Sequence, residues 1–442
     1  MRYHATKAIA PLRGEVRVPG DKSLSHRAVL FSAMANGESH LTGVLDSADV
    51  RSTIAAVSAL GARVDVAEGP HGLAVTVDGW GEAGPSEPLG AVDCGNSGTT
   101  ARLLLGVLSG WDIHAVLTGD ESLSARPMRR VTEPLAAMGA RVETTTAGTL
   151  PVGIRGGALE PRRHELAVAS AQVKSALLLA GLRASGATTV CEPAPSRDHT
   201  ERLLPLFGVS VDRDASGCVS VSGPASLVAT SFDVPADPSS AAFLIAAALL
   251  VPGSDVVLPD VALNTTRTGF LRVLVRMGAR IDVDLPVCPG DVEPVEPVGT
   301  IRARHGGVLR GTTVAPDEVP ALVDEVPILA VVAAMANGTT RFEGVGELRV
   351  KESDRLAAVV SALQALGATA DAVGDTLVVH GPSAFTGAAL DSLGDHRLAM
   401  AYAVAGLAAS ESVTIDRFEA IDVSYPSFPA DVAALAVGSV LG

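Results

Sequence analysis

Ser58-Ala-Leu-Gly61-Ala-Arg-Val-Asp65 is one copy of the segment that decides the fold: the end of an apolar helix, a glycine and the start of a strand. A glycine just past the last helical turn supplies the left-handed cap that ends a helix. The segment returns with small changes at residues 137–143, 206–212, 276–282 and 365–371. The chain is therefore expected to be built from a repeated supersecondary unit.

A second segment alternates with the first: a helix of small residues, a short turn, a strand, and a polar loop that opens the next helix. Its copies begin near residues 35, 108, 184, 251, 336 and 409. Six copies in 442 residues indicate six tandem units of strands plus two helices. We expect two domains of three units each.

Glycine and proline near residues 223–238 predict the break between the two halves. The expected N-terminal domain is 19–230, and the C-terminal domain combines 1–18 with 231–442, because the first dozen residues precede the first complete helix unit. A Pro-rich stretch at 285–298 is expected to be a surface excursion.

Composition excludes several classes of protein. Only 3% of the residues are aromatic and the net charge is −15, whereas nucleic-acid binding needs a basic face and usually stacking aromatics. The apolar runs at 241–251, 328–336 and 398–409 are too short to span a bilayer and are expected to be buried helices. Four cysteines (Cys94, Cys191, Cys218 and Cys288) lack metal-binding or redox spacing. We expect a soluble cytoplasmic protein with free thiols.

Polar loops that carry arginine or lysine stand before several helices. Helix starts receive anions, and added cations make charge-assisted contacts with phosphate or carboxylate. Arg51 and Arg267 fit ordinary helix-start pairs better than anion contacts, although either is open. Lys351 and Arg355 stand together in 349–355, which favours an anion site. Lys351 is one of only four lysines, with Lys7, Lys22 and Lys174.

Two carboxylates stand near these cations. Asp324 precedes an apolar helix and is either its N-cap or a base for a substrate hydroxyl. Glu352 is either a surface ion pair or a proton donor.

Six motifs in order resemble the 5-enolpyruvylshikimate-3-phosphate (EPSP) synthase family of 3-phosphoshikimate 1-carboxyvinyltransferases. They are Pro19-Gly-Asp-Lys-Ser-Leu-Ser-His-Arg27, Gly95-Asn-Ser-Gly-Thr99, Arg126-Pro127, Ser170-Ala-Gln172, Arg349-Val-Lys-Glu-Ser-Asp-Arg355 and Asp395-His-Arg397. The resemblance extends from Gly14 to Phe428. It implies a two-domain inside-out α/β barrel, with helices inward, sheets outward and the active site in the cleft between the domains.

The resemblance implies transfer of the enolpyruvyl group of phosphoenolpyruvate to the 5-hydroxyl of shikimate 3-phosphate, in the shikimate pathway of aromatic amino acid biosynthesis. A tetrahedral intermediate would form and release phosphate. No metal or organic cofactor is implied, and we expect a monomer that binds neither nucleic acid nor membrane.

The resemblance also implies site residues. Shikimate 3-phosphate would contact Lys22, Ser23, Arg27, Ser170, Ala171, Gln172, Arg197, Asp324 and Lys351. Phosphoenolpyruvate would contact Lys22, Asn96, Gly98, Arg126, Gln172, Arg355 and Arg397. Catalysis would rest on Asp324, which deprotonates the 5-hydroxyl, on Glu352, which protonates the methylene carbon and takes the proton back, and on Lys22.

Two alternatives and one departure accompany this hypothesis. The sister transferases that act on UDP-N-acetylglucosamine carry a reactive cysteine where this chain has Glu121. A non-catalytic sensor of phosphorylated metabolites would gain nothing from Asp324 and Glu352. Some EPSP synthases place a lysine before the C-terminal aromatic-Pro pair, and residues 420–426 contain none.

Overall fold

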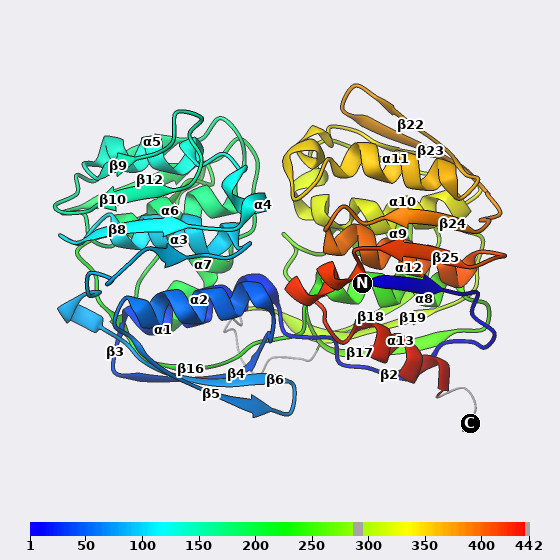
Figure 1. The fold of residues 1–442 in the computed structure, drawn as a ribbon, viewed down its shortest axis with the longest axis horizontal. Helices are drawn as coiled ribbons and strands as arrows, with labels where there is room; N and C mark the ends of the chain where they lie inside the picture. Colours follow the sequence, from blue (N-terminus) through cyan, green and yellow to red (C-terminus); the bar gives the residue numbers. More distant parts are fainter. Residues whose placement is uncertain (286–294, 438–442) are drawn as a thin grey trace. The chain divides into compact units, whose positions relative to one another are not determined.

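The computed structural model describes residues 1–285 and 295–437 and forms two compact units (Figure 1). The N-terminal unit is Gly20–Val234, and the C-terminal unit combines Met1–Pro19 with Pro235–Gly442. Residues 286–294 of the expected Pro-rich excursion lie outside the described part.

Three four-stranded sheets build the N-terminal unit, and all have the same topology. In each, the first strand runs parallel to the second, and the other neighbours are antiparallel. The sheets are β16 (Ser231–Asp233), β4 (Glu38–Val44), β6 (Gly72–Asp78), β5 (Arg63–Gly69); β7 (Val92–Asp93), β8 (His114–Thr118), β10 (Val152–Arg155), β9 (Arg141–Glu143); and β11 (Arg163–Glu165), β12 (Ala187–Cys191), β14 (Val219–Ser222), β13 (Asp212–Arg213). A short pair joins β15 (Leu227–Val228) to β3 (Ala35–Asn36).

The C-terminal unit repeats this topology twice in full and once with three strands. Its sheets are β2 (Arg13–Glu15), β17 (Asp255–Ala262), β19 (Val298–Arg304), β18 (Arg280–Asp284); β20 (Thr313–Val314), β21 (Gly338–Phe342), β23 (Thr376–Gly381), β22 (Thr369–Val373); and β24 (Ala388–Asp391), β25 (Val413–Asp416), β1 (Arg2–Ala5). The six predicted units are therefore confirmed.

Each repeat carries one buried helix, and these helices form the two cores. They are α1 (Lys22–Met34), α3 (Gly98–Leu108), α6 (Ala171–Gly181), α8 (Pro238–Leu250), α10 (Val326–Met335) and α12 (His396–Ala408). All thirteen residues of α8 are buried, and α8, α10 and α12 pack on one another (Figure 1). The apolar runs predicted as buried helices are thus confirmed.

Amphipathic helices and short turns complete the repeats. The helices are α2 (Ala48–Ala59), α4 (Glu121–Ser124), α5 (Arg129–Met138), α7 (His199–Leu203), α9 (Gly269–Arg276), α11 (Arg355–Ala365) and α13 (Phe428–Val437). The 3-10 turns are η1 (Gly81–Ala83), η2 (Leu204–Phe207), η3 (Val319–Ala321), η4 (Val323–Glu325), η5 (Gly346–Val350) and η6 (Phe418–Val423).

The predicted glycine caps are present at all five copies of the opening segment. Gly61 and Gly139 have φ of 104° and 117°, and Gly208, Gly278 and Gly367 are also left-handed. A side chain is strained at such φ values, so glycine is the residue that ends these helices.

Two strands pair in a different unit from the helix that follows them in the chain. β2 precedes α1 in the chain but pairs with β17 of the C-terminal unit. β16 precedes α8 but pairs with β4 of the N-terminal unit. The sequence boundary at 230/231 assigned Ser231–Asp233 to the C-terminal domain, whereas this ladder places the strand in the N-terminal unit.

Candidate active site

Arg355, the first residue of α11, is the centre of the site residues in the C-terminal unit. Its side chain is 1% exposed, and its Nε donates to Asp395 Oδ2 at 2.7 Å. Its terminal nitrogens donate to Asp324 Oδ1 at 3.2 Å and to Glu352 Oε2 at 2.6 Å. Burial works to lower the pKa of Arg355, but the charges of Asp395, Glu352 and Asp324 outweigh burial and raise that pKa. One permanently charged guanidinium thus holds both carboxylates that sequence analysis assigned to proton transfer.

Asp324 is not a helix cap. The N-cap of α10 is Glu325, and its side chain makes no capping hydrogen bond. The Asp324 carboxylate is 14% exposed and lies 3.8 Å from Lys351 Nζ and 3.7 Å from Arg397 Nη2. With Arg355, three cations therefore surround the Asp324 carboxylate.

Lys351 and Arg397 are the more exposed cations of this group. Lys351 is 22% exposed and contacts Glu347 Oε1 at 2.8 Å. Arg397 is 12% exposed and lies 3.4 Å from Glu325 Oε1. The backbone N–H of Arg397 donates to Asp395, the N-cap of α12. The carboxylates around these cations, Asp324, Glu325, Glu347, Glu352 and Asp395, outnumber them, so a substrate anion must compete for Lys351 and Arg397 with groups of the chain itself.

In the N-terminal unit, the loop before α3 lies beside Arg126. Asn96 Oδ1 accepts a hydrogen bond from Arg126 Nη2 at 2.8 Å, and Asn96 Nδ2 donates to Asp120 Oδ2 at 2.7 Å. Gly98 opens α3 and is buried. A Cβ at Gly98 would lie 2.6 Å from Arg102 Nη1 and 3.6 Å from Arg126 Nη1. The absence of a side chain at Gly98 therefore lets two guanidinium groups approach the helix start.

Arg102 was missed as a site residue by sequence analysis. Its Nη1 donates to Gln172 Oε1 at 2.6 Å, while Gln172 Nε2 donates to Thr99 Oγ1 at 2.9 Å. Gln172 is thereby held between α3 and α6. The available signal was position, since Arg102 follows Gly98 by four residues and so lies on the same face of the helix.

The start of α6 is held by a buried carboxylate. Ser170 is the N-cap, and its side chain makes no capping hydrogen bond. The backbone N–H of Ser170 donates to Glu192 Oε1 at 2.8 Å, and Ser196 Oγ donates to Glu192 Oε2 at 2.7 Å. Lys174, 3% exposed, lies 2.7 Å from Glu192 Oε2. Glu192 therefore connects Ser170 to the loop that carries Arg197, and Lys174 is shared between Glu192 and Glu201.

The start of α1 carries the third group of predicted residues. Asp21 caps this helix by accepting from Leu24 N, and Lys22 Nζ lies 2.5 Å from Asp49 Oδ2. Arg27 is 3% exposed. It donates to Ser23 O, to Thr200 Oγ1 at 2.8 Å and to Ser175 Oγ at 2.9 Å. Arg27 thus joins α1 to α6 and α7.

Two arginines left open by sequence analysis have structural partners. Arg51 pairs with Asp46 on the surface, where both side chains are about half exposed. Arg267 and Asp237 form a buried pair at 3.0 Å.

The prediction of free thiols is wrong for two cysteines. Val190 of β12 pairs with Val219 of β14, so the next antiparallel pair places Cys191 opposite Cys218, and the structure joins them in a disulfide. The residues are 27 apart in sequence, and strand pairing alone brings them together. Cys94 is free and buried, and Cys288 lies outside the described residues.

Within residues 1–285 and 295–437, no group of three or more His, Cys, Asp or Glu side chains is placed to hold a metal ion. None of the helices in this part of the chain combines the length and apolar character that crossing a membrane requires.

The chain is similar to known proteins over nearly its whole length. The family model described as EPSP synthase (3-phosphoshikimate 1-carboxyvinyltransferase) matches residues 6–432. A 3-phosphoshikimate 1-carboxyvinyltransferase of Halorhodospira halophila is 50% identical over 428 residues, which are 97% of this chain and 94% of the relative. One from Geobacillus kaustophilus is 48% identical over 432 residues, covering 97% and 98%.

Solved structures agree with the predicted fold class. An EPSP synthase of Acinetobacter baumannii has a TM-score of 0.86 at 40% identity and covers 98% of both chains. The enolpyruvyl transferase NikO of Streptomyces tendae has a TM-score of 0.76 at 20% identity, covering 98% of this chain and 97% of its own, and shows a shared fold alone. The predicted enolpyruvyl-transferase fold is thus confirmed. This chain belongs to the EPSP synthase family of 3-phosphoshikimate 1-carboxyvinyltransferases.

Proposed function

We propose that the chain transfers the enolpyruvyl group of phosphoenolpyruvate to the 5-hydroxyl of shikimate 3-phosphate, releasing inorganic phosphate. Family membership supports this reaction. The observation that carries it is the placement of Asp324 and Glu352 on one buried guanidinium, that of Arg355, with Lys351 and Arg397 alongside. A protein that only bound anions would not gain from carboxylates there, because like charges repel.

The addition step needs one acid and one base. Glu352, in its protonated form, gives its proton to the methylene carbon of phosphoenolpyruvate, whose π electrons form the new C–H bond. The 5-hydroxyl oxygen bonds to the neighbouring carbon while Asp324 accepts the hydroxyl proton. The product is a tetrahedral intermediate that carries both phosphate groups.

The elimination step reverses the role of Glu352. Its carboxylate takes a proton from the new methyl group, the C–H electrons rebuild the double bond, and the C–O bond to phosphate breaks. Asp324 passes the proton that it took from the 5-hydroxyl to the departing phosphate, so Glu352 and Asp324 both end in their starting states. Because Arg355 donates to Glu352 Oε2 at 2.6 Å, the same guanidinium orients this carboxylate in both steps.

Charge complementarity supports the proposed binding residues, since each substrate brings a phosphate and a carboxylate. For shikimate 3-phosphate they are Lys22, Ser23, Arg27, Ser170, Ala171, Gln172, Arg197, Asp324 and Lys351. For phosphoenolpyruvate they are Lys22, Asn96, Gly98, Arg126, Gln172, Arg355 and Arg397. Lys22 would also assist catalysis. To these we add Arg102, as the residue that positions Gln172.

The binding residues divide by burial into two roles. Arg27 and Arg355 are almost fully buried and hold other groups of the chain. Lys22, Lys351 and Arg397 are 12–22% exposed and are the better placed to meet a substrate from solvent. The N-terminus of α6, where Ser170 has no capping bond, suits a phosphate group.

We also propose that the chain works as a monomer in the cytoplasm. Every residue assigned to a substrate comes from a single chain, so the reaction needs no residue from a second copy. Light scattering after size-exclusion chromatography measures the mass in solution, and a dimer mass would overturn the monomer.

Release of inorganic phosphate from phosphoenolpyruvate tests the reaction. The acceptor is shikimate 3-phosphate in one arm and UDP-N-acetylglucosamine in the other. Release with shikimate 3-phosphate alone is expected. Release with the nucleotide sugar would assign the sister reaction, and silence with both acceptors, from folded protein that binds shikimate 3-phosphate, would favour a sensor.

A further inference from the structure

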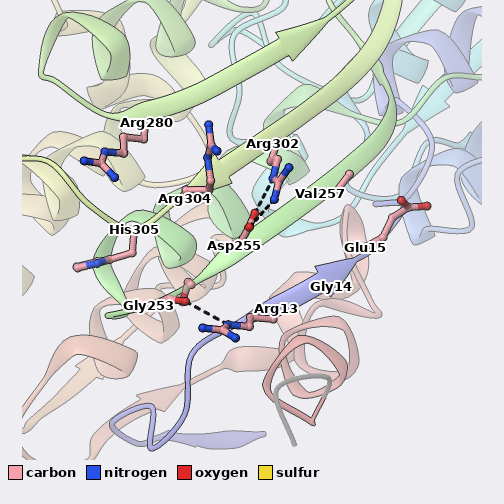
Figure 2. Close-up of a pocket in the computed structure, with 11 residues that line it drawn as sticks. Arg13, Gly14, Glu15, Gly253, Asp255, Val257, Arg280, Arg302, Arg304 and His305 are labelled. Atoms are coloured by element: carbon pink, nitrogen blue, oxygen red, sulfur yellow. Dashed lines mark hydrogen bonds and ion pairs between the residues drawn. The ribbon is translucent and has the colours of Figure 1, made fainter. Parts of the chain in front are cut away.

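An open pocket of about 680 Å³ lies on the solvent-facing side of the sheet β18-β19-β17-β2 (Figure 2). It belongs wholly to the C-terminal unit and shares no residue with the candidate active site. Strand register places Arg280, Arg304, Asp255 and Arg13 in one row across the four strands. The flanking residues Val256 and Ala303 face the core and are fully buried.

The row is dominated by arginine. Arg280 lies directly opposite Arg304 in the antiparallel ladder, and like charges directly opposite each other destabilise a sheet. Arg302, on the same face, and His305, at the end of β19, also line the pocket (Figure 2). A cluster of positive charge therefore exists locally in a chain whose net charge is −15.

Only part of this charge is neutralised by the chain. Arg302 pairs with Asp255 through two contacts, at 2.8 and 2.6 Å, and Arg304 pairs with Asp282. Within the described residues, Arg280 has no carboxylate partner, and Arg13 donates only to the carbonyl of Gly253, at 3.3 Å. Arg304 Nε is buried without a hydrogen-bond acceptor in that same part of the chain.

We propose that this pocket binds a compact anion with two or more phosphoryl groups, as in inorganic pyrophosphate. Guanidinium groups match phosphate oxygens in paired hydrogen bonds. The cations come from β2, β18 and β19, so an anion that meets them all must bridge several strands, which favours more than one phosphoryl group. Among the described residues that line the pocket, Val257 alone has an apolar side chain, which favours a small, highly charged anion over a ligand with a large apolar group.

The inference goes beyond the proposed function and stands independently of it. The pocket residues take no part in the reaction, so loss of the pocket is expected to leave turnover unchanged. Because Arg13 belongs to β2, which pairs with β17 over three residues, a bound anion that joins Arg13 to Arg280 also secures this short strand.

Isothermal titration calorimetry of the full chain with pyrophosphate tests the proposal. The unmodified protein is compared with an Arg13→Gln/Arg280→Gln variant, which removes the two pocket arginines that form no salt bridge with a carboxylate among the described residues. The matched control is Arg141→Gln/Arg155→Gln, another pair of directly opposed arginines on an outer sheet. We expect pyrophosphate binding to weaken about tenfold or more in the pocket variant and to be unchanged in the control.

Several outcomes would overturn the proposal. Unchanged binding in the pocket variant would do so, as would equal weakening in the control, which would indicate general surface charge. Equal affinity for orthophosphate and pyrophosphate would refute the requirement for two phosphoryl groups. The single variant Arg280→Glu gives an independent check. The Arg280 side chain is exposed, so the substitution does not put the folding of the variant at risk. Phosphate release by each variant is measured alongside, so loss of the active site is distinguished from loss of the pocket.

Discussion

The pair between Arg355 and Asp395 is the buried interaction on which the C-terminal part of the site depends most. The Asp395 side chain is 0% exposed and that of Arg355 is 1% exposed. Replacing Asp395 with Asn removes one charge from this pair but keeps an oxygen that can cap α12 by accepting from Arg397 N. The substitution therefore isolates the charge from the cap.

The expected loss follows from burial. Breaking a buried ion pair by removing one partner costs about 3–5 kcal/mol, because the remaining charge is left uncompensated. Arg355 keeps Asp324 and Glu352, so we expect a loss near the lower end, about 3 kcal/mol. The control is Asp391→Asn, whose pair with Arg417 is about half exposed on both sides and should contribute less than about 1 kcal/mol.

Urea denaturation at pH 7, followed by far-UV circular dichroism, measures both losses. Tryptophan fluorescence is recorded in parallel, because Trp80 and Trp111 both lie in the N-terminal unit. If the urea midpoint falls more when followed by dichroism than when followed by tryptophan fluorescence, the loss of stability belongs to the C-terminal unit. If Asp395→Asn proved no more destabilising than Asp391→Asn, the argument that Arg355 depends on Asp395 would be refuted.

Three further predictions concern chemistry, space and charge. Glu352→Gln and Asp324→Asn should each lower kcat about 10²–10⁴-fold with an unchanged dichroism spectrum. Glu347→Gln is the control, because it makes the same change at a more exposed residue, and it should have little effect on kcat. Near-normal turnover in Glu352→Gln or in Asp324→Asn would exclude that residue from proton transfer. Gly98→Ala should raise KM for phosphoenolpyruvate about tenfold, since the new Cβ displaces Arg102 from Gln172. Gly90→Ala, with nothing within 4 Å, is the control, and equal KM values would contradict the steric argument. Burial, with the charges of Lys22 and Arg27, lowers the pKa of His26 well below its usual value. The unfolded chain therefore binds a proton near pH 6.5 that the folded chain does not, so stability should fall below that pH by up to about 1.4 kcal/mol per pH unit. Urea midpoints are measured from pH 7 to pH 5, and the part of their pH dependence that comes from His26 should be missing in His26→Gln. If the midpoints of the unmodified protein and of His26→Gln changed equally with pH, a contribution of His26 would be excluded.

Local sequence determined the repeat. A helix ends where a left-handed glycine follows an apolar helical stretch, and this depends on neighbouring residues alone. For the same reason the buried helices α8, α10 and α12 could be predicted from continuous apolar runs. The motifs also identified the family, because they stand in short segments whose order along the chain can be read from the sequence.

Tertiary structure alone decided which side chains meet. The bond between Arg355 and Asp395 joins residues 40 apart, and that between Arg102 and Gln172 joins residues 70 apart. The disulfide between Cys191 and Cys218 follows from the register of two strands, as does the row of arginines in the anion pocket. The pairing of β16 with β4 of the N-terminal unit likewise has no local signal, whereas the place of β2 in the C-terminal unit was expected from the sequence. Strand partners and register are fixed by packing over the whole core, and a shift of one residue would turn every side chain of a strand to the opposite face.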